Sequence, residues 1–219
     1  MKANSNESKG DNAPSARQAE VLDATLRLLV EDGHALTMAA VARRASCSKE
    51  TLYKWFGDRD GLLSATVQYQ ASRVHVPAVG PARIDRASLI ERLEDFAAKW
   101  LTVISSDTSL ALNRVAIGQA VSDQGHLGAI VLKQGRFALG ERLKPVLEAG
   151  RAAGFLRFDD SETAFRSFFG LFARDVQIRL LLGENLKMTT ASIKADAANA
   201  TRQFFALYGA EAPAGSTGS

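Results

Sequence analysis

The chain has 219 residues but one cysteine, five prolines and no hydrophobic run near the ~18 residues that a membrane-spanning helix needs. One cysteine excludes an internal disulfide and a cysteine-based metal site, which fits a reducing cytoplasm. The polar N-terminus lacks the apolar core of a secretory signal peptide. Few prolines and few alternating β-branched runs favour an all-helical chain. We therefore expect a cytoplasmic protein with no membrane partner.

Sequence signatures of catalysis are also missing. The chain has no GxGxxG, GxxxxGK(S/T) or GxSxG motif and no His, Cys and carboxylate cluster at ligand spacing. Glu31 and His34 have Glu-x-x-His spacing, but Gly33 lies between them and a second such pair is lacking. Cys47 is interpreted as a small packing residue rather than as a redox-sensing thiol. We expect no enzyme, no cofactor and no metal site.

Charge is a weak guide to partners, because the net charge is only +3. The hydrophobic content of 46% supports one large domain or two small ones. Pro77, Gly80 and Pro81 interrupt the helical pattern and indicate a domain boundary. We expect four segments: a disordered tail at 1–15, one domain at 16–75, a second domain at 84–209 and a disordered tail at 210–219.

The stretch 37–56 predicts two short helices joined by a tight polar turn. Thr37 can cap the first helix and Ser48 the second. The second helix buries Leu52 and leaves a polar face outside. Helices this short need neighbours. We expect one helix at 15–32 with Gly33 as its C-terminal cap, and another that begins after its candidate N-cap, Asp58. This arrangement is a helix-turn-helix pattern.

The second half predicts a helical bundle. Ser88 to Glu91 has the capping-box pattern and opens a helix that reaches about Ile104. A shorter helix follows, and a break from Gly125 to Gly128 separates it from a long segment in which Pro145 predicts a kink. Asp159 and Asp160 are expected to cap one long apolar helix. The expected bounds of the later helices are 108–121, 161–182 and 192–208. The fold class is thus all-α, with an N-terminal three-helix helix-turn-helix domain and a C-terminal helical bundle.

Residues 17–70 resemble the N-terminal DNA-binding domain of the TetR family of bacterial transcriptional regulators. The resemblance lies in a helix that ends at Gly33, in Thr37, in the run Ser48-Lys49-x-Thr51-Leu52-Tyr53-x-x-Phe56, and in Arg59 before Leu62-Leu63. It implies a homodimeric regulator, a repressor by the habit of the family. Such a regulator binds a palindromic operator in double-stranded DNA and is released by a small-molecule effector, here of apolar or amphipathic character.

The resemblance also implies DNA contacts. Tyr53 is expected to contact a phosphate, and Arg59 is expected to grip the backbone at the start of the fourth helix. Lys49 and Lys54 would seek guanine acceptors, and Glu50 could accept from cytosine N4. The full predicted set is Thr37, Met38, Ser48, Lys49, Glu50, Thr51, Tyr53, Lys54, Trp55 and Arg59.

Three positions depart from the family pattern. Ser46 stands where the family often has glycine. Trp55 stands where Tyr or His is common, and core packing and a phosphate contact both remain open for it. Glu50 replaces a usual Gly or Pro, and we prefer a DNA-facing role over that of a solvated first-turn acid.

In the second domain the resemblance implies a dimer interface and an effector pocket. The apolar residues of the last long helices cover more than one face of the helix. These faces are therefore expected to pack against a partner subunit, an internal core or both. The predicted interface is Phe165, Phe168, Phe169, Phe172, Val176, Phe204, Phe205 and Tyr208. The predicted pocket is Phe96, Trp100, Ile104, Leu112, Val115, Val131 and Phe137, for each of which plain core packing is the preferred alternative. His126 and Arg114 are candidate polar anchors.

A helical protein-interaction module is the rival function. It would explain the bundle but leaves the outward set Lys49, Thr51, Tyr53 and Lys54 without a purpose. Salt-dependent binding to duplex DNA separates the two functions.

Overall fold

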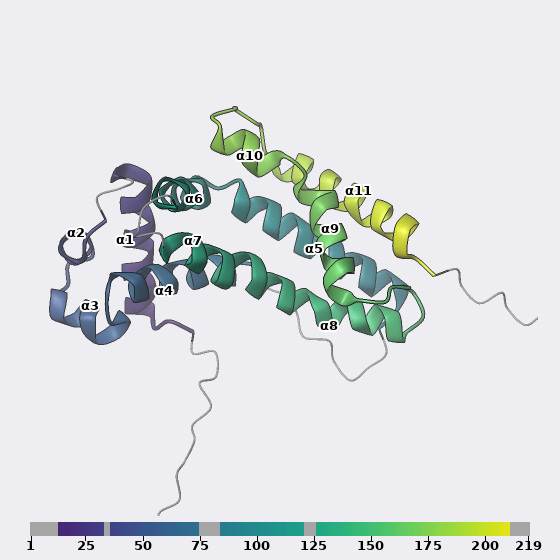
Figure 1. Cartoon of the computed structure of the whole chain (residues 1–219), viewed down its shortest axis with the longest axis horizontal. Coiled ribbons are helices and arrows are strands. Elements are labelled where there is room, and N and C mark those ends of the chain that lie inside the picture. Colours follow the sequence, from purple (N-terminus) through teal and green to yellow (C-terminus); the bar gives the residue numbers. More distant parts are fainter. Residues whose placement is uncertain (1–12, 33–35, 75–83, 121–125, 211–219) are drawn as a thin grey trace, which may run out of the picture.

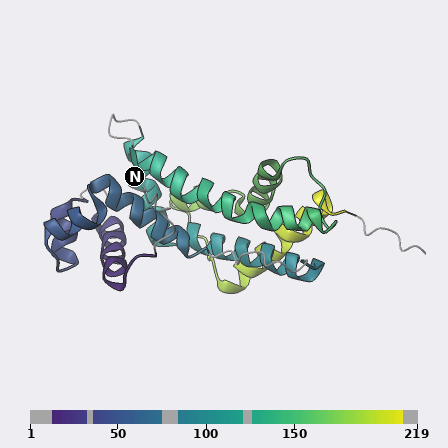
Figure 2. The same cartoon turned by 90° about the horizontal axis from the view of Figure 1, so that it is seen from below.

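The computed structural model describes residues 13–32, 36–74, 84–120 and 126–210. Within these ranges the chain is mostly helical, and the helices within residues 16–72 lie at one end of an elongated body, whereas the last helix ends near the other (Figures 1 and 2). The expected cap at Gly33, His34, the Pro77 to Pro81 break and nearly all of both predicted tails fall outside the described residues. Among the described residues, no helix is long and apolar enough to cross a membrane.

The N-terminal group consists of α1 (Ala16–Asp32), α2 (Met38–Arg44), α3 (Lys49–Phe56) and α4 (Arg59–Ser72). Three predicted caps are confirmed. The side chain of Thr37 accepts from the Ala40 backbone N–H, that of Ser48 from Thr51, and that of Asp58 from Gly61. These bonds satisfy N–H groups that a helix start leaves free.

The C-terminal group begins with α5 (Arg86–Ile104) and α6 (Asp107–Gln119). The capping box predicted at Ser88 is wrong, because Asp85 caps α5 and its carboxylate accepts from the Ser88 backbone N–H. The helix therefore begins one turn earlier than expected.

A single long segment follows the predicted glycine break. It consists of α7 (His126–Ile130), the π-helix η2 (Val131–Phe137) and α8 (Ala138–Ala152). Gly128 lies inside α7 rather than in a break. Helix α8 is assigned without interruption through Pro145, and the irregular stretch is η2, further upstream.

The long helix predicted over 161–182 is two helices, α9 (Ser161–Ala173) and α10 (Val176–Leu181). Arg174 ends α9 with a positive φ of 41°, a backbone conformation that cannot continue a right-handed helix. Its guanidinium donates to Asp196 at 2.6 Å, which ties the break to α11 (Thr190–Tyr208). The connector after α8 also meets the end of α11, since Arg157 N–H donates to the Tyr208 carbonyl at 2.8 Å.

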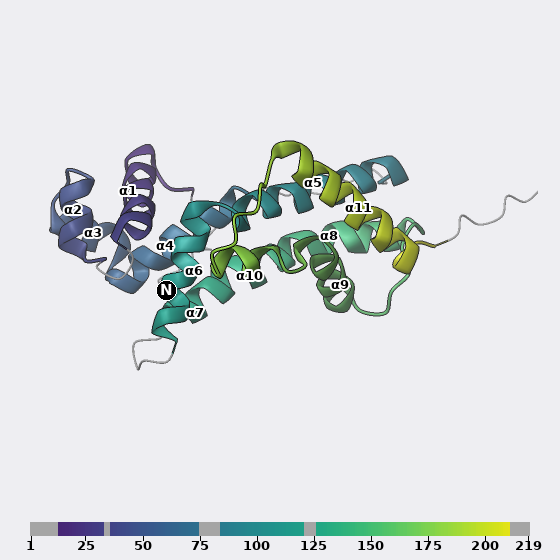
Figure 3. The same cartoon turned by 90° about the horizontal axis from the view of Figure 1, so that it is seen from above.

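Two hydrophobic cores hold the helices together. In the C-terminal core α11 lies along α5 and α9 (Figure 3), around Phe96, Phe165, Phe168 and Phe204. The other core contains residues of α1, α2, α3 and α4, and it continues into α6 and α7. Helix α4 also contacts η2, so it touches elements of both ends.

Candidate nucleic-acid interface and internal cavity

Helix α3 presents one buried and one exposed face. Leu52 is 0% exposed, while Tyr53 is 53% exposed. Lys49, Glu50 and Lys54 are also exposed, so the charged residues of the predicted base-reading set share the outer side of α3 with Tyr53. A short helix with a capped N-terminus and a polar outer face can enter a DNA major groove.

Two of the remaining α3 candidates have structural roles in the protomer. The Thr51 hydroxyl lies 3.0 Å from the Ser48 hydroxyl, at the helix cap. Trp55 is half-buried, packs against the N-terminal core and meets Phe56 edge-on with ring centroids 6.2 Å apart. Part of the Trp55 ring therefore serves packing, and the other part faces solvent.

Glu50 carries a charge suited to its position. A hydrogen bond from its own backbone N–H, and then one from the Ser48 hydroxyl, lower the pKa of Glu50. The carboxylate is thus ionised at the positive end of α3, where a negative charge is favourable.

The candidate residues outside α3 differ in which of their groups remain available for a DNA contact. Thr37 is exposed, whereas Met38 is only 7% exposed, so the backbone N–H of Met38 rather than its side chain is left for a phosphate. The Arg59 Nε donates to the Leu36 carbonyl at 3.1 Å, which ties the start of α4 to the segment before α2. The Arg59 Nη1 lies 3.9 Å from the Asp60 Oδ1.

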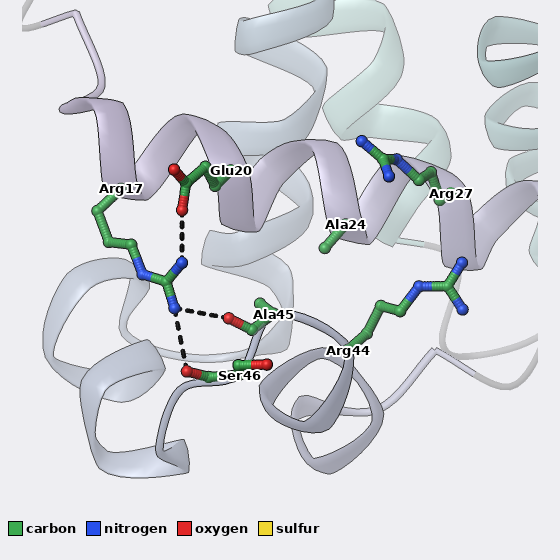
Figure 4. Close-up of a pocket in the computed structure, with 7 residues that line it drawn as sticks. All are labelled: Arg17, Glu20, Ala24, Arg27, Arg44, Ala45 and Ser46. Atoms are coloured by element: carbon green, nitrogen blue, oxygen red, sulfur yellow. Dashed lines mark hydrogen bonds and ion pairs between the residues drawn. The ribbon is translucent and has the colours of Figure 1, made fainter.

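The turn between α2 and α3 is held by a residue that sequence reasoning missed. Ser46 has a φ of +50°, which explains why glycine suits this position. The Arg17 Nη2 on α1 donates to the carbonyls of Ala45 at 2.7 Å and Ser46 at 3.0 Å (Figure 4). These residues border a hollow of about 270 Å³ between α1 and the turn. Nothing local in the sequence pairs Arg17 with a turn almost thirty residues away.

A second cavity, of about 260 Å³, lies among α4, α5, α6, η2, α8, α9 and α10. Four of the predicted pocket residues line it: Trp100, Ile104, Leu112 and Val131. The other three do not. Phe96 and Val115 are buried in the two cores, and Phe137 is 55% exposed at the end of η2.

The polar lining of this cavity was not predicted. It comprises Gln70, Ser109, Asn113, Arg136 and Gln177. The expected anchors His126 and Arg114 do not line it, and Arg114 instead donates to the Leu180 carbonyl at 3.0 Å. One sequence feature could have indicated a polar lining. Gln70 is a polar residue at a position of α4 that continues the spacing of its buried apolar residues.

The predicted dimer-interface residues divide by burial. Phe165, Phe168, Phe172 and Phe204 are 0% exposed in the single protomer, because they form its core. The members that keep some exposed surface are Phe169, Val176, Phe205 and Tyr208.

Comparisons with known proteins agree with this geometry. Residues 21–66 match the family "Bacterial regulatory proteins, tetR family", and residues 91–210 match "AefR-like transcriptional repressor, C-terminal domain". The crystal structure of a TetR transcriptional regulator from Agrobacterium tumefaciens is 48% identical, with 90% of this chain and 96% of that one covered and a TM-score of 0.78. The Flavonoid-responsive Regulator FrrA is 26% identical, covers 90% and 98% of the two chains, and has a TM-score of 0.66.

A curated relative matches this chain over a short stretch. The HTH-type transcriptional regulator BetI of Burkholderia thailandensis is 46% identical over 54 residues, which are 24% of this chain and 28% of that protein. The chain is therefore aligned with little more than a quarter of this relative's length. Family models match both domains, and the match to the Agrobacterium tumefaciens regulator covers nearly all of that chain. This protein therefore belongs to the TetR family of transcriptional regulators, with a DNA-binding helix-turn-helix domain.

Proposed function

We propose that the chain is a homodimeric repressor that binds a palindromic operator and leaves it when a small molecule occupies the cavity. The observation that carries the proposal is the position of α4. This helix starts next to the helix-turn-helix at Arg59 and, through Gln70, also lines the cavity.

In the proposed complex α3 lies in the major groove. Lys49 and Lys54 donate to guanine O6 and N7, and Glu50 accepts from cytosine N4, each worth ~1–3 kcal/mol of discrimination. The Tyr53 hydroxyl, the Arg59 guanidinium and the N-termini of α2 and α4 bind phosphates.

The dimer follows from the same reasoning. Two copies related by a twofold axis read two half-sites one helical turn apart, so operator symmetry mirrors protein symmetry. We assign the interface to the outer faces of α9 and α11, and on α11 Phe205 and Tyr208 keep exposed surface. The four buried phenylalanines support this interface from beneath.

Release by an effector requires that the ligand favour one arrangement of α4 over another. The Gln70 amide donates to the hydroxyls of Ser106 and Thr108, so a ligand beside Gln70 acts where α4 is joined to α6. Responsiveness of FrrA to flavonoids supports a small organic effector for a related chain.

Fluorescence anisotropy with labelled duplex DNA from upstream of the coding region tests the proposal. The titration is run at two salt concentrations with excess unrelated DNA, and light scattering after gel filtration gives the oligomeric state. We expect a dimer whose specific binding survives the competitor and weakens with salt. Absence of binding at both salts from a folded, ligand-free protein would favour a protein-interaction module instead.

A further inference from the structure

The cavity beside α4 is lined mainly by apolar side chains, but two of its polar groups lack the partners that their chemistry requires. The apolar lining includes Trp100, Leu112, Leu139 and Phe169. The two polar groups are the amide of Gln70 on α4 and the guanidinium of Arg136 on η2. They decide which ligand the cavity can accept.

Gln70 is 4% exposed, and only one end of its amide is satisfied. Its Nε2 donates to the hydroxyls of Ser106 at 3.2 Å and Thr108 at 3.0 Å. The Ser106 hydroxyl donates its own hydrogen to the Val103 carbonyl at 2.7 Å, so it must accept from Gln70, which fixes the orientation of the amide. Oε1 is then buried without a hydrogen-bond partner among the described residues. A ligand O–H or N–H group that reaches this oxygen removes an unfavourable desolvation.

Arg136 is half-buried and lies over two aromatic rings. Its Cζ is 4.6 Å from the ring centroid of Phe165 and 4.4 Å from that of Phe169. In the part of the chain that the structure describes, no carboxylate pairs with it, since Glu162 instead pairs with Lys144 at 3.0 Å. Burial lowers the pKa of Arg136, with Glu162 acting in the opposite direction. A guanidinium stays charged in proteins and can only donate, so a carboxylate is its natural complement.

Among the described residues that line the cavity, Arg136 alone is charged. The cavity volume of about 260 Å³ is slightly below the common range for ligand sites, ~300–1,000 Å³, which favours a compact ligand. Aromatic lining and a rigid ring suit each other, because a rigid ligand loses little conformational freedom on binding.

We propose that this cavity binds a small hydroxylated aromatic carboxylic acid, with its carboxylate on Arg136 and its hydroxyl donating to Oε1 of Gln70. The inference rests on the proposed effector role of the cavity and names the chemical class of the effector. Such a ligand bridges α4 and η2, and these elements already touch, with the Gly135 backbone facing the Val67 side chain. The π-helical form of η2 fits this role, because such segments are rare and frequent at functional sites.

Isothermal titration calorimetry with three related probes tests the proposal. The probes are 4-hydroxycinnamate, cinnamate without the hydroxyl, and the uncharged methyl ester of 4-hydroxycinnamate. For the parent protein we expect the acid to bind about 10–100-fold more tightly than the ester, and the hydroxyl to add about 2–10-fold.

Two variants assign each preference to its residue. Arg136→Gln should abolish the preference for acid over ester, and Gln70→Leu should abolish the preference for the hydroxyl. Lys133→Gln is the matched control, because Lys133 is an exposed cation on the same η2 segment that does not line the cavity. Circular dichroism melting checks that each variant folds, and the probe series on the parent alone keeps the test valid if one does not.

Equal affinity for acid and ester, or a preference that survives Arg136→Gln, would overturn the inference. So would a lack of binding by 4-hydroxycinnamate up to about 1 mM. DNA anisotropy on the same preparations separates the two proposals. If the protein binds DNA but not the acid, only the inference about the ligand is refuted. If it binds the acid but not DNA, only the proposed regulator function is refuted.

Discussion

Replacement of Arg17 by methionine tests how the turn between α2 and α3 is held. The change keeps an apolar stem of similar length and removes the guanidinium. That group donates to the carbonyls of Ala45 and Ser46 at the end of α2 and pairs with Glu20 on its own helix. A cation at this place also suits the negative end of a helix.

The expected loss follows from these contacts. A hydrogen bond from a charged donor contributes ~1.5–3 kcal/mol when it is well buried. The Arg17 side chain is 46% exposed, so solvent screens both bonds, and the exposed pair with Glu20 adds ~0–1 kcal/mol at most. We expect a loss of about 1.5 kcal/mol in the free energy of unfolding, which lowers Tm by about 3–6 °C for a chain of this size.

Thermal melting and DNA anisotropy measure the two consequences. Because the turn orients α3, operator affinity should fall more than affinity for unrelated DNA. Arg27→Met is the matched control, since Arg27 borders the same hollow with an exposed side chain and without a hydrogen bond among the described residues (Figure 4). Equal Tm values for the two variants and the parent would refute this account of the turn.

Three further predictions concern the helix ends and the DNA-facing side. Tyr53→Phe should weaken operator binding about 2–10-fold and Lys54→Ala about 5–150-fold, and both should leave the dimer intact, as anisotropy and light scattering would show. Ser46→Gly should raise stability by about 0.5–1 kcal/mol in urea unfolding, because glycine relieves the positive φ. Hydrogen bonds from Thr163 lower the pKa of Asp160, so its stabilising effect is complete at neutral pH and is lost as pH falls through the lowered folded-state pKa. Asp160→Asn should therefore flatten the acid side of a Tm-against-pH profile.

Capping residues explain why so much of the N-terminal domain could be predicted from sequence. The signals at Thr37, Ser48 and Asp58 are local, because the capping side chain and the N–H it accepts from lie three residues apart. The same logic failed at Ser88 since Asp85, three residues earlier, offers a stronger acceptor to the same helix start.

Features that depend on distant contacts could not be read from the sequence. The break between α9 and α10 coincides with the ion pair of Arg174 and Asp196, which are 22 positions apart. Arg17 gives no local sign of the turn that it holds. Gln70 could be assigned to the buried side of α4, but its role in a cavity depends on α6 and η2 lying against that helix.

The unsatisfied Gln70 oxygen also gives a scale for regulation. A ligand that supplies the missing hydrogen bond in one arrangement of α4, and not in the other, gains ~0.5–1.4 kcal/mol of differential affinity. That gain, about 2–10-fold, overlaps the lower end of typical allosteric coupling, ~5–150-fold in affinity. Thermodynamic linkage makes this coupling reciprocal, so operator DNA must weaken ligand binding by the same factor by which the ligand weakens DNA binding. Calorimetry of the acid probe with and without operator DNA would measure that factor, and Gln70→Leu should bring it close to one while operator binding persists. A factor unchanged in this variant would place the coupling elsewhere than at Gln70.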